Sequence, residues 1–239
     1  MPIHNPLLLI TNNIEESLLQ KIFAREFLVD VIPFIQTEIL HTKVLQQQIE
    51  NIVSLNETII FTSANAVEAV IKYLQKKPEW KIYCIGNATR ILVEDFFGKE
   101  SIIAVADNGK ALAKKIVADK LTNEVYFFCG DKRRDELPEI LHQHNVKINE
   151  IVVYKTLIIH HTIEKNYDGI LFFSPSAVEG FFKNNLINDE SILFAIGNTT
   201  ANEIKKYSKN KIVLSDKPGK ENLIEKVIDY FSNEPSNFS

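Results

Sequence analysis

Short apolar runs alternate along the chain with segments in which apolar residues recur every three or four positions. Most of the runs are almost continuously apolar, which is typical of parallel strands covered on both faces. The periodic segments between them predict amphipathic helices. This regular alternation predicts a doubly wound α/β architecture. The expected strands are PLLLI, LVDVIPF, TIIFTS, KIYCIG, SIIAVA, EVYFFC, INEIVVYKTLII, GILFFS, ILFAIG and KIVLSD.

The number of expected strands bears on how many sheets form. Ten strands are many for one sheet in a chain of 239 residues, so we expect two sheets of about five strands each. The expected helices between them include AVEAVIKYLQ, ATRILVEDFF, LPEILHQ, AVEGFFKN and LIEKVIDYF.

Two internal repeats support this division. Residues 59–93 align with residues 170–204 at a constant offset of 111, so that IIFTSANAVEAV meets ILFFSPSAVEGF and CIGNATR meets AIGNTTA. A weaker match sets 7–37 against 126–156 at an offset of 119, with few identities but the same strand–turn–helix–strand pattern. The order of the repeats predicts two domains of related fold.

The repeated turns lie where a strand ends and a helix begins, the edge at which open parallel sheets bind ligands. Three pairs have the spacing of capping boxes, and Gly86 and Gly197 would allow close approach of the backbone. Well-capped helices alone would also explain these residues. The three pairs are Asn65 with Glu68, Ser176 with Glu179, and Thr200 with Glu203.

A cluster of basic residues follows another expected strand, in the segment CGDKRRDELPEIL at 129–141. Lys132, Arg133 and Arg134 precede an expected helix, whose free N–H groups and positive partial charge favour anions. The alternative is a solvated turn.

Composition excludes several classes. The net charge of −4 gives no support for nucleic-acid binding. No apolar run approaches the roughly 18 residues of a membrane span, and the N-terminus has no basic segment typical of a signal peptide. Cys84 and Cys129, the only cysteines, lie in expected strands and suit a reducing cytoplasm.

Motifs for metals and nucleotides are also missing from the sequence. The pairs His160–His161 and His142–His144 have no carboxylate or cysteine at ligand spacing. Neither dinucleotide-binding nor P-loop glycine motifs are present, and the Ser-Pro-Ser turn at 174–176 lacks the glycines of a nucleophile elbow. We therefore expect no metal and no cofactor.

The ordered set FTSANAVEAV, IGNATR, CGDKRRDELPEIL, VVYKT, FFSPSAVEGFF and AIGNTTANEI resembles the uroporphyrinogen-III synthase family over nearly the whole chain. One departure is TNN at 11–13, where many members place an arginine. The resemblance implies two flavodoxin-like α/β domains joined by a two-stranded β-ladder. These would be residues 1–34 with 160–239, an inserted domain at 41–148, and ladder strands at 35–40 and 149–159. Sequence alone would equally allow each domain to form from consecutive segments.

The resemblance also implies an activity. Such an enzyme is a cytoplasmic hydro-lyase of haem biosynthesis that cyclises hydroxymethylbilane, a linear tetrapyrrole with eight carboxylates, with inversion of the last pyrrole ring and loss of water. The family resemblance implies a small-molecule substrate held in the cleft between the domains. We also expect a monomer and, from charge and composition, no nucleic-acid or membrane partner. The alternative is a hinged two-domain protein that binds a small anion without catalysis.

The same resemblance names candidate residues. Tyr154 in VVYKT matches the tyrosine of the family's ladder and is the expected proton donor to the departing hydroxyl, the alternative being a packed aromatic residue. Across the weaker repeat its counterpart is the apolar Ile35. The expected substrate contacts are Thr62, Ser63, Asn65, Gly86, Asn87, Thr89, Lys132, Arg133, Ser174, Ser176, Gly197, Asn198, Thr199 and Thr200.

Overall fold

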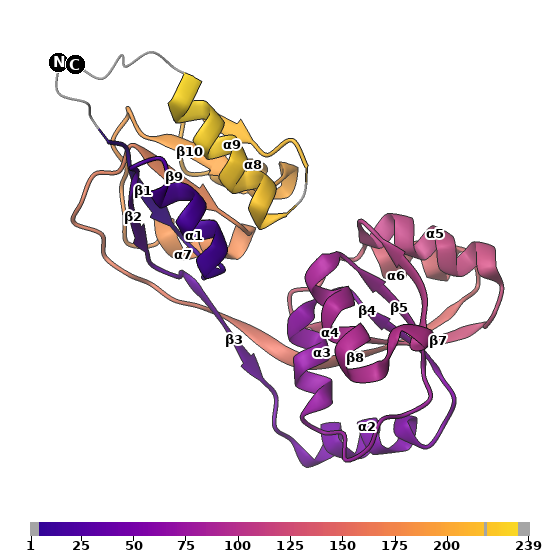
Figure 1. Cartoon of the computed structure of the whole chain (residues 1–239). Helices are drawn as coiled ribbons and strands as arrows, with labels where there is room; N and C mark the ends of the chain where they lie inside the picture. Colours follow the sequence, from indigo (N-terminus) through magenta and orange to yellow (C-terminus); the bar gives the residue numbers. More distant parts are fainter. Residues whose placement is uncertain (1–4, 218, 234–239) are drawn as a thin grey trace. The chain divides into compact units, whose positions relative to one another are not determined.

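The computed structural model describes residues 5–217 and 219–233 and divides the chain into two compact units (Figure 1). Unit 1 comprises the described residues up to Gln36 and from Leu157 onward, and unit 2 comprises Thr37–Thr156. Each unit has a sheet with helices on both faces, which confirms the predicted α/β class with two parallel-sheet cores.

Unit 1 contains a five-stranded parallel sheet built from both ends of the chain. Its strands, in spatial order, are β11 (Ile212–Leu214), β10 (Ile192–Ala195), β9 (Gly169–Phe172), β1 (Leu7–Ile10) and β2 (Leu28–Val31). The central strands are fully buried, which explains their continuous apolar sequences.

The helices of unit 1 cover both faces of this sheet. On one face α1 (Glu16–Phe23) and α9 (Lys220–Asn233) bury leucine, isoleucine and valine side chains against β1 and β10. On the other face α7 (Pro175–Phe182) and α8 (Asn198–Ile204) pack against β9 and β10.

The second sheet has six strands and lies mainly in unit 2, although two of its strands extend into residues of unit 1. In spatial order they are β3 (Ile35–Ile39), β8 (Lys147–Ile158), β7 (Glu124–Gly130), β4 (Thr58–Phe61), β5 (Lys81–Ile85) and β6 (Ile102–Ala106). The pairs from β8 to β6 are parallel.

The helices of unit 2 also divide between two faces. The helices α2 (Lys43–Val53), α3 (Ala64–Ile71) and α4 (Asn87–Phe97) cover one face, which we call the α3 face. The helices α5 (Gly109–Asp119) and α6 (Glu136–Gln143) cover the other, the α6 face. A short 3-10 helix, Lys99–Ser101, follows α4.

The internal repeats correspond to equivalent elements. The helix α7 begins and ends 111 residues after α3, and β9 begins 111 residues after β4. In chain order the strands of unit 1 lie as 2-1-3-4-5, the flavodoxin-type order. Unit 2 has the same arrangement, with β7 and β8 in the places of β1 and β2. Each sheet therefore has one topological switch point, between β1 and β9 in unit 1 and between β7 and β4 in unit 2.

The expected capping boxes are wrong. The helices begin directly after the strands, at caps Ser63, Ser174 and Gly197, so the three pairs that begin with Asn65, Ser176 and Thr200 lie inside helices. Only Ser174 of these caps uses its side chain, whose Oγ accepts from the backbone N–H of Ala177 at 3.2 Å. The three pairs have the sequence spacing of a capping box, but each helix begins two or three residues earlier than a cap at Asn65, Ser176 or Thr200 would require.

The expected strand LVDVIPF, residues 28–34, is shorter than predicted: β2 ends at Val31, because Pro33 cannot donate to a ladder, and a separate strand, β3, begins at Ile35. The following β3 lies beside β8, with Leu40 N–H donating to Val153 O and Ile159 N–H to Phe34 O, so the two strands are antiparallel. The strand β8 also pairs with β7 from Lys147 to Tyr154.

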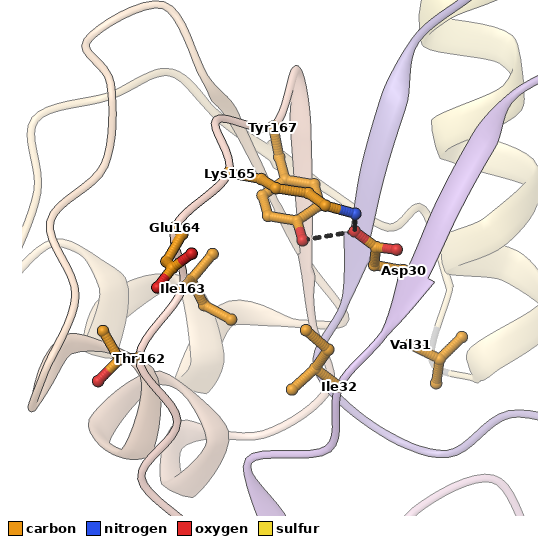
Figure 2. A pocket seen from close by; sticks show the side chains of 8 residues that line it. All are labelled: Asp30, Val31, Ile32, Thr162, Ile163, Glu164, Lys165 and Tyr167. Carbon is orange, nitrogen blue, oxygen red and sulfur yellow. Dashed lines mark hydrogen bonds and ion pairs between the residues drawn. The ribbon is translucent and has the colours of Figure 1, made fainter.

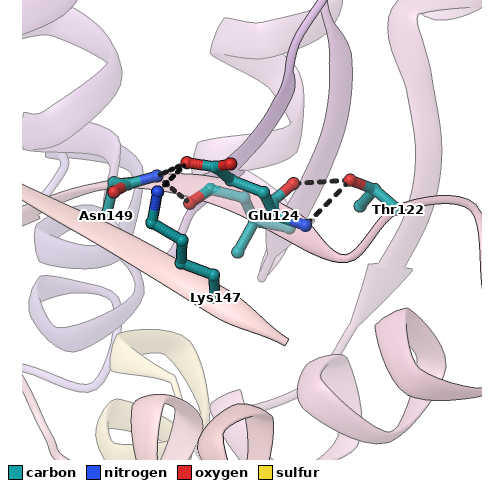
Figure 3. Close-up of polar contacts among 5 residues, drawn as sticks. Thr122, Glu124, Lys147 and Asn149 are labelled. Atoms are coloured by element: carbon teal, nitrogen blue, oxygen red, sulfur yellow. Dashed lines mark hydrogen bonds and ion pairs between the residues drawn. The ribbon is translucent and has the colours of Figure 1, made fainter. Parts of the chain in front are cut away.

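Polar contacts at the amino ends of β7 and β8 fix the register of this pair (Figure 3). The Glu124 carboxylate accepts from Lys147 Nζ and Asn149 Nδ2, each at 2.7 Å. The hydrogen bond from Lys147 lowers the pKa of Glu124 below its usual range. These contacts lie at the opposite end of the sheet from the turns that follow the strands.

Candidate functional site

Two expected site residues meet at the switch point of unit 2. There the helix after β4 covers the α3 face and the helix after β7 covers the α6 face. Ligands of open α/β sheets bind outside the carboxyl ends of the strands at such a point. Ser63 follows β4, Gly130 ends β7, and Tyr154 lies on β8 beside it.

Tyr154 reaches across the end of β7. Its phenol donates a hydrogen bond to Ser63 Oγ at 3.1 Å. The ring lies so close to Gly130 that a Cβ there would stand 2.5 Å from Tyr154 Cε2 and Cζ. Only glycine at this position leaves room for the ring. The backbone of the next residue fixes the strand, since Asp131 N–H donates to Tyr154 O.

An irregularity in β8 directs Tyr154 toward Ser63. Ile151 and Val153 pack on the α3 face, so strict alternation would turn Tyr154 to the α6 face. The pairing with β7 shifts, however: Cys129 pairs with Val152, but Gly130 pairs with Tyr154. Val153 is therefore an extra residue, and Tyr154 packs on the α3 face with it. Bulges of this kind often redirect a side chain at functional sites.

The electrostatics keep the phenol protonated. Burial raises the pKa of Tyr154 above its usual value, while the hydrogen bond with Ser63 acts in the opposite direction. Burial also raises the pKa of the neighbouring Cys129 thiol to about 11, and that of Cys84 likewise. Both thiols are free and buried. At neutral pH the site thus offers neutral hydroxyl groups and no thiolate.

Further expected contacts surround this point on unit 2. Gly86 caps α4 with φ +70°, a conformation that favours glycine. Asn87 is the first residue of α4, and its side chain lies outside the described part. Thr89 is buried in the first turn, and Thr62 is half-buried in the turn before Ser63.

The basic turn divides into residues with different surroundings. The Arg133 guanidinium forms ion pairs with Asp135 and Glu150. Lys132 is exposed and, within residues 5–217 and 219–233, has no ion-pair partner. Lys132 is therefore available to an anion, whereas Arg133 is already neutralised by two carboxylates.

The remaining expected contacts lie at the carboxyl edge of unit 1. Ser174 caps α7, and Ser176 is half-buried in its first turn. Gly197 precedes α8, where Asn198 and Thr199 are exposed. Thr200 is 1% exposed, and within the described part of the chain its Oγ1 has no hydrogen-bond partner.

A pocket of about 350 Å³ lies beside the edge strand of unit 1, and none of these residues lines it (Figure 2). It is lined by Asp30, Val31, Ile32, Thr162, Ile163, Glu164, Lys165 and Tyr167. Asp30 Oδ2 accepts from Lys165 Nζ and Tyr167 Oη, each at 2.7 Å. Because these polar groups already bind one another, we do not assign the functional site to this pocket.

Asp30→Asn should lower the free energy of unfolding more at neutral pH than in acid. The hydrogen bond from Lys165, and next that from Tyr167, hold the pKa of Asp30 below its ordinary 3.8. A depressed folded-state pKa stabilises the fold above the unfolded value, and this stabilisation is lost as the pH falls through the folded value. Since Lys165 is well exposed, the loss at pH 7 should be about 1 kcal/mol or less.

Urea unfolding at pH 7 and pH 3 measures this difference. Glu164→Gln, an exposed change in the same pocket, is the matched control and should alter stability little at either pH. An equal loss for Asp30→Asn at both pH values would contradict the assignment.

Among the described residues, no group of three or more His, Cys, Asp or Glu side chains could hold a metal ion. In the same part of the chain, every helix is too short or too polar to cross a membrane.

Comparisons with known proteins agree on one family. A family model described as uroporphyrinogen-III synthase HemD matches residues 16–225. A Saccharomyces cerevisiae protein named uroporphyrinogen-III synthase is 28% identical over 204 residues, which cover 73% of this chain and 70% of that protein. The Ruminiclostridium josui porphyrin biosynthesis protein HemD is 25% identical over 189 residues, which cover 72% of this chain but only 37% of that protein.

Solved structures resemble the fold. The uroporphyrinogen-III synthetase of Helicobacter pylori superposes with a TM-score of 0.69 at 17% identity, over 95% of this chain and all of that one. A mutant uroporphyrinogen III synthase from Thermus thermophilus gives a TM-score of 0.62 at 12% identity, over 95% and 98% of the two chains. At these identities the likeness concerns the fold alone.

Proposed function

The chain belongs to the uroporphyrinogen-III synthase family of lyases in tetrapyrrole biosynthesis, and we propose that it cyclises hydroxymethylbilane at the hydroxyl site of unit 2. The observation that carries this assignment is the Tyr154–Ser63 hydrogen bond at the switch point of that sheet. The product is the macrocycle with its last pyrrole ring inverted, and water is the second product.

In the proposed mechanism Tyr154 donates a proton to the departing hydroxyl. The carbon–oxygen bond breaks with its electron pair going to oxygen, while the pyrrole nitrogen, which keeps its proton, supplies electrons to form an azafulvenium cation. The substituted carbon of the last ring attacks this electrophile, and the spiro intermediate fragments and recloses through the unsubstituted carbon. The proton that this carbon releases restores the phenol, so that only water is lost overall.

Binding of the substrate carboxylates is assigned to the turns at the carboxyl edge of each sheet. Helix N-termini and hydroxyl groups there supply donors without requiring a positively charged protein. This proposal covers the threonine, serine, asparagine and glycine residues predicted from the sequence. Each neutral hydrogen bond contributes about 1 kcal/mol net, so no single donor should dominate.

Lys132→Ala should raise KM several-fold and leave kcat nearly unchanged. Among the described residues no carboxylate pairs with the exposed ammonium, and an exposed charge-assisted contact contributes about 1 kcal/mol. Arg133→Ala is the matched comparison. It should lower thermal stability more than Lys132→Ala does, because it leaves Asp135 and Glu150 unpaired. Steady-state kinetics and thermal unfolding measure both. An unchanged KM in Lys132→Ala would remove Lys132 from the binding site.

The decisive test of the function uses freshly prepared hydroxymethylbilane. The products are oxidised to porphyrins and the isomers separated by chromatography. We expect the isomer with the inverted ring, since the unassisted bilane closes without inversion. A hinged binding protein, the alternative function, would yield only the uninverted isomer.

We further propose that the enzyme acts as a cytoplasmic monomer, in keeping with its two free buried thiols. Residues 35–40 and 149–159 would be the ladder between a domain of 1–34 with 160–239 and a domain of 41–148. The pairing of β3 with β8 supports this assignment. Light scattering in solution tests the monomer.

A further inference from the structure

Two copies of the same turn use their serine in different ways. In unit 1, Ser174 Oγ caps α7 by accepting from Ala177 N–H. In unit 2, the equivalent Ser63 makes no side-chain cap bond to α3, and its Oγ accepts from Tyr154 instead. A serine at a cap position normally stabilises its helix by about 1 kcal/mol. Ser63 forgoes that bond, which indicates a role other than capping.

Two residues that contact each other beside Ser63, Gly130 and Tyr154, also differ from their counterparts in unit 1. At the offset of the weaker repeat, Gly130 corresponds to Thr11 and Tyr154 to Ile35. Thr11 is fully buried, and its hydroxyl donates to Leu171 O at 2.7 Å, which joins β1 to β9. Unit 2 has no side chain at that position, and the Tyr154 ring occupies the space. Unit 2 thus differs from unit 1 in its contacts at all three positions, and together these differences place the hydroxyl groups of Ser63 and Tyr154 side by side.

We propose that Ser63 and Gly130 are positioning residues for the Tyr154 phenol. Gly130 leaves the space in which the ring lies over the end of β7, and Ser63 holds the phenol oxygen at the switch point. This inference rests on the proposed function, because it concerns how the proton donor of that reaction is held.

Ser63 also acts during proton transfer. A serine hydroxyl has one O–H donor and two acceptor lone pairs, so it can reverse its part in the hydrogen bond. When the substrate binds, the Tyr154 O–H turns from Ser63 Oγ to the departing hydroxyl, and the Ser63 O–H turns to donate to the phenol oxygen. The Tyr154 O–H bond then breaks as its proton passes to the departing hydroxyl. No proton leaves Ser63, and the negative charge on the phenol oxygen is stabilised until the proton released from the substrate carbon returns.

Gly130→Ala should shift the ring rather than the strand. The new Cβ would meet ring atoms at 2.5 Å and the phenol oxygen at 2.7 Å, so the ring must move away from it. The Tyr154 hydroxyl would then no longer lie within hydrogen-bond distance of Ser63 Oγ. The loss in kcat should equal that of Tyr154→Phe, roughly tenfold to a few hundredfold.

The experiment is a double-mutant cycle on kcat with hydroxymethylbilane. Ser63→Ala should lower kcat by roughly tenfold, and Ser63→Thr, which keeps a hydroxyl, should recover most of it. Both Ser63→Ala and Gly130→Ala should cost less than about twofold when added to Tyr154→Phe, because the donor is already gone. The controls in the same unit are Ser101→Ala, whose hydroxyl donates to Gly98 O, and Gly109→Ala, where a Cβ would stand at an ordinary 3.4 Å from Leu137 Cβ.

A spectroscopic measurement separates positioning from a general loss of structure. In protein labelled at tyrosine Cζ, the Tyr154 signal, identified by its absence in Tyr154→Phe, should titrate at higher pH in Ser63→Ala. The inference would be overturned if Ser63→Ala or Gly130→Ala lowered kcat by the same factor in Tyr154→Phe as in the wild-type protein. An unchanged titration midpoint of Tyr154 in Ser63→Ala would also overturn it, and neither result would contradict the proposed function. If the wild-type protein gives no inverted isomer, the proposed function itself is wrong.

Discussion

Tyr154→Phe is expected to lower kcat by roughly tenfold to a few hundredfold, because it removes a positioned proton donor and keeps the ring. The phenol is half-buried, hydrogen-bonded to Ser63, and protonated at neutral pH because burial raises its pKa. The melting temperature and the isomer ratio per turnover should change little, since the packing against Gly130 and the folding of the substrate remain.

Single-turnover rates with hydroxymethylbilane measure this effect. Tyr126→Phe is the matched control, because Tyr126 lies in the amino half of β7 and points to the same α3 face. Wild-type rates in Tyr154→Phe would leave Tyr154 as a packing residue. A large fall in melting temperature would instead indicate that its hydroxyl bond is structural.

Much of the fold follows from patterns that the sequence states directly. The continuous apolar strands require cover on both faces, and the offset of 111 residues reappears in β4 with β9 and in α3 with α7. What periodicity could not reveal is that β1 and β2 join β9 rather than β4. Both pairings bury the same apolar surface, so only the resemblance to a known family favoured the one observed.

The candidate site was harder to predict, for a local reason. Tyr154 and Ser63 were both expected site residues, but the sequence did not predict the hydrogen bond between them. Strict alternation along β8 would have directed Tyr154 to the opposite face of the sheet. The extra residue Val153 leaves no mark in the apolar pattern of VVYKT. One signal was available: Gly130 ends a buried strand where its repeat counterpart is Thr11, and a glycine there indicates that something approaches closely.

Phe128→Ala is expected to lower the free energy of unfolding of unit 2 by about 3–5 kcal/mol, the range for truncating a fully buried aromatic side chain. Phe128 is completely buried. Its ring stacks on Phe61 at 5.6 Å between centroids and lies 5.9 Å from Trp80. Removing it would leave a cavity among aromatic rings that cannot close by small movements of side chains.

Trp80 provides a direct measurement, because it is the only tryptophan of the chain and is buried in unit 2. Its fluorescence during urea unfolding therefore reports on the unit that contains the candidate site. Ile91→Ala, at a position 49% exposed on α4, is the matched control and should cost about 0.5 kcal/mol or less. A loss below about 1 kcal/mol in Phe128→Ala would mean that this cluster is not what stabilises unit 2. Because Phe61 and Phe128 lie two residues before Ser63 and Gly130 on their strands, the same packing holds the two ends of the site in place.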